Sequence, residues 1–186
     1  MSASIRPFDY AASLQKHAIP EGEYLSQHQD VHIICTGAVV FNDEGKILLV
    51  QRAKDEKAFP DAWEIPGGKM DGTDETILHA AARELKEETG LTATRVVRQV
   101  AQFTFSDGWG DRPTKTWLKL IFQFEVEDAE AVVLDPIEHQ SYLWACEEEV
   151  VKDLVAERST PLRYISQQNK DVKLEAFKLQ REAAAA

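Results

Sequence analysis

Residues 83–91 read Arg-Glu-Leu-Lys-Glu-Glu-Thr-Gly-Leu. They close a segment, residues 74–89, in which apolar side chains recur at helical spacing: Leu78, Ala81, Ala82 and Leu85. Gly90 stands where helices often stop in the left-handed conformation. The sequence therefore predicts a helix over residues 74–89.

Three carboxylates share one flank of this predicted helix. Glu84, Glu87 and Glu88 are three or four residues apart, which places them side by side on a helix surface. Clustered carboxylates repel one another, and a divalent cation placed among them reverses the sign of that interaction. Oxygen ligands favour Mg²⁺ or Mn²⁺ over zinc. A glutamate-rich helix on its own is more often just a solvated surface. The prediction of a metal site therefore depends also on the loop that precedes the helix.

The loop before the helix contains a double glycine. Trp63, Glu64 and Ile65 lead into Pro66-Gly67-Gly68-Lys69, and glycine permits backbone angles that are closed to other residues. A glycine loop that feeds a helix start can point backbone N–H groups at phosphate oxygens. The sequence thus predicts a phosphate site beside a metal site, with Gly67 and Gly68 on the substrate side.

With these two segments together, the chain resembles the Nudix hydrolases. Their box reads Gly, five residues, Glu, seven residues, Arg-Glu-apolar-x-Glu-Glu-x-Gly-apolar, and residues 83–91 match every defined position of its second half. Upstream, Glu75 stands seven residues before Arg83, but six residues instead of five separate it from Gly68. An equivalent reading keeps the gap of five and puts Asp74 in the place of that glutamate.

The resemblance implies a fold, a reaction and roles for residues. The fold is an α/β/α sandwich with a mixed β-sheet between helices. The reaction is hydrolysis of the phosphoanhydride bond of a nucleoside diphosphate linked to another moiety, or of a related small diphosphate. By the same carry-over, Glu84, Glu87 and Glu88 bind Mg²⁺ or Mn²⁺, Glu87 and Glu88 take part in catalysis, and Arg83 orients the loop and its carboxylates.

The base that activates water is less closely defined by the resemblance. In some members it is a box glutamate, and in others a carboxylate on a later loop shortly before a tryptophan. Here Glu138 and His139 precede Trp144. We expect Glu138 to assist the water, and we expect His139 to be a surface or hydrogen-bonding residue.

Three further residues are candidates for substrate contacts. Arg52, at the end of a predicted strand, and Lys69, beside the double glycine, have the charge to bind phosphate, although such side chains are mostly solvated. Trp109 lies in a glycine-containing loop, where it would either stack on a base or anchor the loop.

The remaining patterns predict an α/β arrangement in one globular domain. Strand-like runs cover residues 31–41, 46–51, 96–105, 116–126 and 142–145, and further helices are expected at 147–155 and 171–186. Residues 42–45 carry the turn chemistry of a hairpin. We expect an N-terminal extension, 1–30, that packs on the body, a catalytic domain at 31–158, and a partly helical C-terminal extension at 159–186.

Composition narrows the partners. The formal net charge of −11 disfavours polymeric nucleic acid and leaves a small nucleotide or diphosphate as the expected substrate. No apolar run approaches the length that spans a membrane, and the start lacks the pattern of a secretory signal, which predicts a cytoplasmic protein. Cys35 and Cys146, both in apolar contexts, are expected to be reduced and buried.

Two other classes of function compete with the hydrolase. A catalytically silent Nudix-fold module would bind or sense a nucleotide, but it would be expected to have lost one of the three glutamates. An isomerase acting on an allylic diphosphate would need a cysteine near the reacting double bond, and neither cysteine has that context. A homodimer that exchanges residues 1–30 is also consistent with the sequence.

Overall fold

The computed structural model describes residues 6–107 and 114–185. The strands are β1 (Asp9–Tyr10), β2 (Ile33–Val40), β3 (Ile47–Arg52), β4 (Trp63–Glu64), β5 (Ala93–Ser106), β6 (Thr116–Val126), β7 (His139–Ala145), β8 (Leu154–Val155) and β9 (Thr160–Pro161). The helices are α1 (Glu21–Gln27), α2 (Ile77–Thr89), α3 (Glu147–Lys152) and α4 (Gln167–Ala184), with short 3₁₀ segments at Ala12–His17 and Ala156–Arg158.

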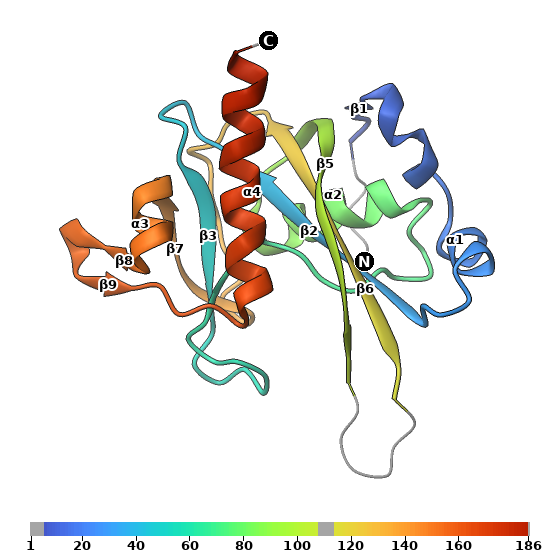
Figure 1. Ribbon diagram of the computed structural model, residues 1–186, viewed down its shortest axis with the longest axis horizontal. Coiled ribbons are helices and arrows are strands. Elements are labelled where there is room, and N and C mark those ends of the chain that lie inside the picture. Colours follow the sequence, from blue (N-terminus) through green and yellow to red (C-terminus); the bar gives the residue numbers. More distant parts are fainter. Residues whose placement is uncertain (1–5, 108–113, 186) are drawn as a thin grey trace.

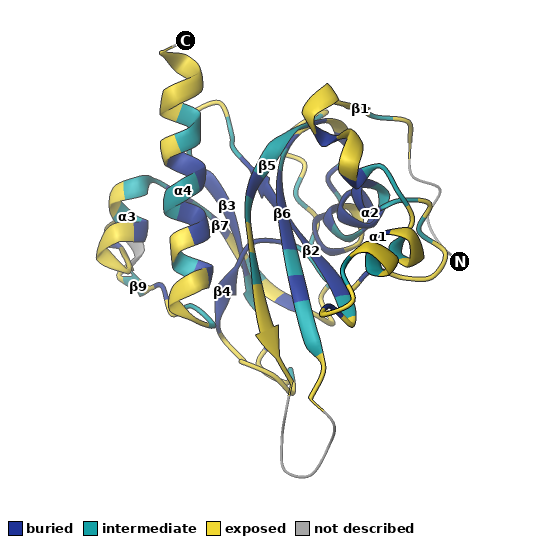
Figure 2. Cartoon of the chain, turned by 45° about the vertical axis from the view of Figure 1, so that its right-hand side comes forward, coloured by how far each residue is buried: buried dark blue, intermediate teal, exposed yellow. Residues whose placement is uncertain are grey.

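The main strands form two sheets with α2 and α4 on opposite sides (Figures 1 and 2). The larger sheet has the order β1-β5-β6-β2, in which β5 and β6 are antiparallel while β2 runs parallel to β6. The smaller sheet has the order β4-β3-β7 and is antiparallel. The α/β sandwich is therefore confirmed, with its central strands divided between two sheets.

The turn at residues 42–45 joins strands that separate almost at once. Asn42 holds the turn by accepting from the backbone N–H groups of Glu44 and Lys46, but β2 and β3 pair only through a bridge between Phe41 and Ile47. One edge of β2 pairs with β6 along its whole length, and the loop at 66–70 occupies the other edge. The hairpin expected from sequence is thus limited to its turn, because β2 has no free edge for β3.

Helix α2 matches the periodicity that predicted it, with a later start. It begins at Ile77 because the Thr76 side chain caps it by accepting from the N–H of His79, so residues 74 and 75 belong to the preceding loop. It ends at Gly90, which has φ of 70° as the sequence indicated. Its apolar face packs on the larger sheet, where Leu78, Ala81 and Leu85 are buried with strand residues such as Ile34 and Phe122.

The C-terminal elements differ from the prediction in their bounds. The helix expected at 147–155 stops at Lys152, because Asp153 adopts a left-handed conformation and starts the turn into β8. Helix α4 begins at Gln167, where the Ser166 side chain caps it. Figure 1 shows α4 running alongside β3 and β5. The residues around α2 form a first core cluster, and the α4 residues Val172, Ala176 and Phe177 form a second with strand residues such as Ile47 and Val100. No described helix is long and apolar enough to cross a membrane.

One charged side chain lies inside this second core. Lys173 of α4 is fully buried; its Nζ donates to the carbonyl of Asn169 over 2.8 Å and sits 4.7 Å from the centre of the Tyr164 ring. Burial lowers the pKa of Lys173 to about 7, and Lys119 acts in the same direction. The charged form is therefore costly in the folded state.

We expect Lys173→Met to raise the free energy of unfolding at pH 7 by about 2–4 kcal/mol. Below pH 7 both states of wild-type Lys173 are protonated and the full cost is present; between 7 and the ordinary value of 10.5 only the unfolded state keeps the proton. Wild-type stability relative to the variant should therefore rise over that pH range, which urea unfolding at several pH values would measure.

The matched control is Lys178→Met on the same helix, where an exposed pair with Glu175 predicts a change within about 0.5 kcal/mol. A Lys173→Met protein less stable than wild type at pH 7 would contradict the expectation.

Candidate active site

The double-glycine loop crosses directly over β2. Backbone N–H groups of Thr36 and Ala38 donate to the carbonyls of Gly68 and Pro66, and Met70 donates back to Ile34. Gly67 has φ of 148°, and a Cβ there would lie 2.2 Å from the carbonyl oxygen of Thr36. The close approach of loop and strand therefore requires glycine at position 67.

Both glycines also face a carboxylate of α2. The N–H of Gly67 donates to Oε2 of Glu88 over 2.7 Å, and a Cβ on Gly68 would lie 2.5 Å from Oε2 of Glu84. The loop thus seats two of the three predicted metal ligands against its backbone. The N–H of Gly67, which we expected to face phosphate, is engaged by Glu88 in this structure.

Arg83 ties the loop to the helix. Its guanidinium binds both carboxylate oxygens of Asp74, at 2.8 and 3.0 Å, and contacts Glu84 at 2.9 Å and Glu87 at 2.6 Å. It also donates to the backbone carbonyl of Lys69. The hydrogen bonds to Asp74 are the main reason that the pKa of Arg83 is raised, so the side chain is a fixed positive charge. These contacts are those of a residue that orients its neighbours.

The structure favours one of the two alignments that the sequence left open. The Asp74 side chain is 3% exposed and forms the bidentate pair with Arg83, whereas the Glu75 side chain is 83% exposed and lies 3.8 Å from His79. This arrangement favours the five-residue spacing from Gly68 to Asp74, in which the extra residue lies between Asp74 and Arg83.

We expect Asp74→Asn to destabilise the protein by about 1–3 kcal/mol, because it weakens a buried charge-assisted pair and leaves part of the guanidinium unpaired. The same measurement on Glu75→Gln should give a change below about 0.5 kcal/mol, since that side chain is solvated. Thermal unfolding monitored by circular dichroism would compare the two. Equal effects would show that Asp74 does not anchor the loop.

The carboxylates at this end of α2 crowd one another. Burial raises the pKa of Glu84; Arg83 opposes the rise, while Glu87 and Glu138 add to it. Glu87 is more open, with a side chain that is 43% exposed and paired with Arg83. Carboxylates that are crowded together are stabilised most when a cation binds among them.

Glu88 is the most enclosed of the three. Burial raises its pKa well above the ordinary value; Glu64 and the other nearby carboxylates add to the rise, against the hydrogen bond from Gly67. Among the residues that the structure describes, Glu88, Glu138 and His139 form a group whose ligand atoms all lie within 4.8 Å of one another. A buried carboxylate with other carboxylates close by, next to further oxygen and nitrogen donors, is a suitable site for a divalent cation.

Glu138 and His139 reach this group from the start of β7. Glu138 is exposed, while its backbone carbonyl accepts from the N–H of Ala53. His139 is 2% exposed, and neither ring nitrogen has a hydrogen-bond partner among residues 6–107 and 114–185. The expectation of a surface residue is therefore wrong for His139, whose Nε2 lies inside the protein 3.7 Å from Glu64.

A buried glutamate that the sequence did not single out completes the centre. Glu64 of β4 accepts from Arg52 Nη1 over 2.8 Å and lies 3.7 Å from His139. Burial alone would raise its pKa, but His139, Lys119 and Arg52 lower it to about 2. The only hint in the sequence was its place between Trp63 and Ile65, in a strand that is otherwise apolar.

The predicted substrate contacts have different surroundings. Arg52 donates to Glu56, to Glu64 and to the carbonyl of Ala58, so its guanidinium is occupied by the protein. Lys69 is exposed at the edge of the loop. Trp109 lies outside the described residues.

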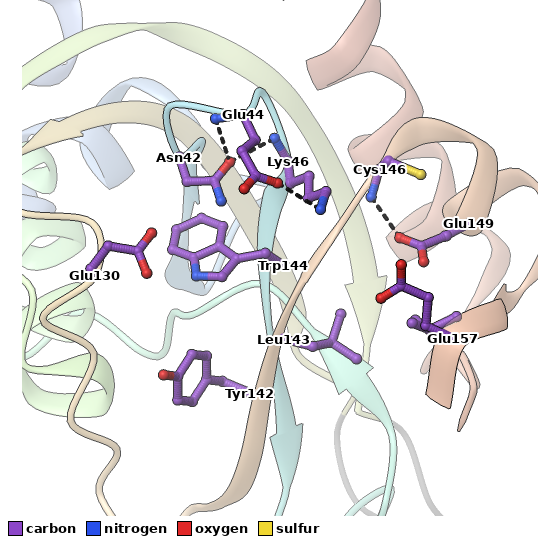
Figure 3. Close-up of a pocket in the computed structure, with 11 residues that line it drawn as sticks. Asn42, Glu44, Lys46, Glu130, Tyr142, Leu143, Trp144, Cys146, Glu149 and Glu157 are labelled. Carbon is purple, nitrogen blue, oxygen red and sulfur yellow. Dashed lines mark hydrogen bonds and ion pairs between the residues drawn. The ribbon is translucent and has the colours of Figure 1, made fainter. Parts of the chain in front are cut away.

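A groove along the edge strand β7 is lined by none of these carboxylates. It has a volume of about 670 Å³, and Figure 3 shows Trp144 and Tyr142 of β7 lining it, with Glu130 on a neighbouring segment. Lys46, on its rim, is paired with Glu44 at 2.7 Å. Its charged lining residues are four glutamates and one lysine, and the lysine is already paired, so this groove is poorly suited to phosphate.

Neither cysteine has the setting that an isomerase would need. Cys35 is buried on β2, where burial raises the pKa of its thiol to about 11. Cys146 is half-buried at the groove of Figure 3. Both thiols are free, and Cys146, expected to be buried, is partly accessible.

Comparison with known proteins gives a consistent result. A sequence model of the NUDIX domain matches residues 31–165. An RNA pyrophosphohydrolase of Novosphingobium aromaticivorans is 32% identical over 65% of this chain and 81% of its own length. Phosphatase NudJ of Shigella boydii is 35% identical over 63% of this chain and 71% of its length. The crystal structure of a MutT protein from Methanosarcina mazei Go1 superposes with a TM-score of 0.61 at 25% identity, covering 81% of this chain and 96% of that one.

Proposed function

Since this chain belongs to the NUDIX domain family, we propose that it is a divalent-metal-dependent hydrolase that cleaves the phosphoanhydride bond of a small nucleotide or related diphosphate. The observation that carries the proposal is the crowding of Glu84 and Glu88, both with raised pKa values, against the double-glycine loop. Relatives named as an RNA pyrophosphohydrolase and a phosphatase support the same reaction class.

The residues of this chain would divide the work as follows. Glu84, Glu87 and Glu88 would hold Mg²⁺ or Mn²⁺, with Glu138 beside Glu88. Arg83 keeps the loop and the carboxylates in register through Asp74, Glu84 and Glu87. The bound metal would neutralise anhydride oxygens and lower the pKa of a water.

We further propose that Glu138 accepts the proton of the attacking water. It is the exposed carboxylate of the group, whereas Glu88 is enclosed and already bonded to Gly67. A positioned base contributes about 10²–10⁴-fold. Glu138→Gln should therefore lower kcat by that factor with little change in KM, and an unchanged kcat would remove Glu138 from this role.

We propose two further roles outside the box, for Lys69 and Arg52. Lys69 is exposed beside the loop and free to reach a phosphate, while Arg52 would act on the substrate only indirectly, by holding Glu64. Trp109 stays a sequence prediction of a stacking residue. A cytoplasmic location and a homodimer formed through residues 1–30 likewise stay predictions.

We propose residues 31–158 as the catalytic domain, with 1–30 and 159–186 as extensions that fold onto it. Leu14 and Tyr24 join the first core, and α4 contributes to the second. The family match to residues 31–165 has similar limits.

The reaction is tested by product release from a panel of substrates. The panel contains ADP-ribose, nucleotide sugars, dinucleotide cofactors, dinucleoside polyphosphates, nucleoside triphosphates and a 5′-triphosphorylated oligoribonucleotide. We expect turnover of at least one small nucleotide with Mg²⁺ or Mn²⁺ and none with a chelator. No turnover of any member, together with measurable nucleotide binding, would favour the silent sensor module. Preference for the oligoribonucleotide would overturn the choice of a small substrate.

A further inference from the structure

We propose that His139 supplies a nitrogen ligand to the divalent cation of this site, so that the cation is held by carboxylates and an imidazole together. The inference rests on the proposed function for the presence of the cation. It goes beyond that function in assigning a donor of a different chemical type, which the glutamates of the box do not predict.

His139 lies close to two carboxylates of the site. The ligand atoms of His139, Glu88 and Glu138 all lie within 4.8 Å of one another, although they come from β7, the last turn of α2 and the loop before β7. An ion bound to Glu88 can reach the His139 ring with small side-chain movements, while Glu138 stays beside it for the attacking water. The exposed Glu138 leaves one side open for entry.

The His139 imidazole is buried and lacks hydrogen bonds in the described part of the chain. The His139 side chain is 1% exposed, and neither Nδ1 nor Nε2 has a hydrogen-bond partner in the described part of the chain. A buried polar group without a partner costs about 1–3 kcal/mol. Coordination to a cation would satisfy one ring nitrogen and recover part of this cost.

Glu64 is the alternative partner for the His139 ring. Glu64 lies 3.7 Å from Nε2 of His139, beyond the range of a hydrogen bond. Glu64 is already neutralised by Arg52, whose Nη1 is 2.8 Å away. Glu64 is therefore hydrogen-bonded to Arg52 and not to His139, and this leaves the ring nitrogens of His139 geometrically available to a metal.

The donor set has a consequence for metal preference. Carboxylates alone suit Mg²⁺, whereas an added imidazole favours transition-metal ions, among which Mn²⁺ is the hardest. We therefore expect His139→Gln to weaken Mn²⁺ binding by about tenfold or more, and Mg²⁺ binding by less. Competition titrations of Mn²⁺ by electron paramagnetic resonance would give both affinities.

The deciding experiment is pulsed electron paramagnetic resonance of the full chain loaded with Mn²⁺. Wild-type protein is prepared once with natural histidine and once with ¹⁵N-histidine. We expect a coupling from a directly bound nitrogen that changes with the isotope and disappears in His139→Gln. The matched control is His17→Gln, a histidine equally buried but bonded to Gln99 and packed against Phe122, which should keep the coupling.

The outcomes are separable. Wild-type protein that binds Mn²⁺ without any histidine coupling would overturn the inference, and this result does not depend on the folding of a variant. A coupling that persists in His139→Gln would also overturn it. Because no turnover is measured, a protein that shows the coupling but cleaves nothing in the panel would support the ligand and contradict the hydrolase.

Discussion

Glu88→Gln is expected to lower kcat by about 10²–10⁴-fold, the range that follows from loss of a catalytic carboxylate. Glutamine has the same shape, and its amide oxygen can still accept from the N–H of Gly67, so the loop should keep its place. The negative charge that faces Glu84 and Glu138 is removed, and with it one of the three proposed metal ligands. Steady-state kinetics with saturating Mg²⁺ on the best substrate of the panel would measure the loss.

The stability of this variant should not fall. Burial and neighbouring carboxylates raise the pKa of Glu88, which means that its charged form opposes folding without a metal. A neutral glutamine removes that cost, so the melting temperature in chelator should equal or exceed that of wild type. The control Glu125→Gln, at an exposed position on β6, should leave kcat within about twofold, as expected of surface substitutions. Loss of activity together with early melting would instead indicate that Glu88 is chiefly structural.

Gly67→Ala is expected to destabilise the fold by about 3–5 kcal/mol. The added Cβ would meet backbone atoms of β2, at 2.2 Å from the Thr36 oxygen and 2.7 Å from the Gly37 Cα, and φ of 148° is strained for alanine. β2 cannot retreat, because it pairs with β6 along its length. Chemical denaturation would measure the change in the unfolding midpoint.

Gly72→Ala provides the matched control for this substitution. Gly72 lies in the same connection between β4 and α2, has ordinary φ, and a Cβ there would meet no atom within 4 Å. We expect this variant to be as stable as wild type or slightly more stable, since alanine restricts the unfolded chain. If the two variants unfold at the same denaturant concentration, the loop tolerates a side chain at position 67 and its approach to β2 is looser than described.

The parts of the molecule that the sequence predicted well are local in the chain. Helix α2 follows from the spacing of Leu78, Ala81 and Leu85, its end follows from Gly90, and the long antiparallel pair β5–β6 follows from two runs of strand-forming residues. Three of the carboxylates lie on this one helix, so their grouping was contained in its periodicity. Local spacing is enough in such cases, because the neighbours in space are neighbours in sequence.

The parts that sequence reasoning missed depend on contacts between distant segments. Glu64 of β4 and the inward position of His139 of β7 were missed, and these residues meet near Arg52 of β3 only because the three strands form a separate sheet. Nothing in the local pattern around His139 distinguishes an inward from an outward ring. The choice between Asp74 and Glu75 also needed the structure, since it depends on which side chain Arg83 reaches after the helix has begun at Ile77.

The pairing of β2 has a consequence for how the protein is made. Ile33 pairs with Trp117, and the register continues to Val40 with Phe124, so the partner of β2 is encoded more than 80 residues later. Pairs so distant in the chain form slowly, and the apolar β2 stays unpaired until residues 117–124 have left the ribosome. During synthesis the glycine loop is the earlier neighbour available to it. A nascent chain stalled before β6 is therefore expected to expose this strand and to be a substrate for chaperones.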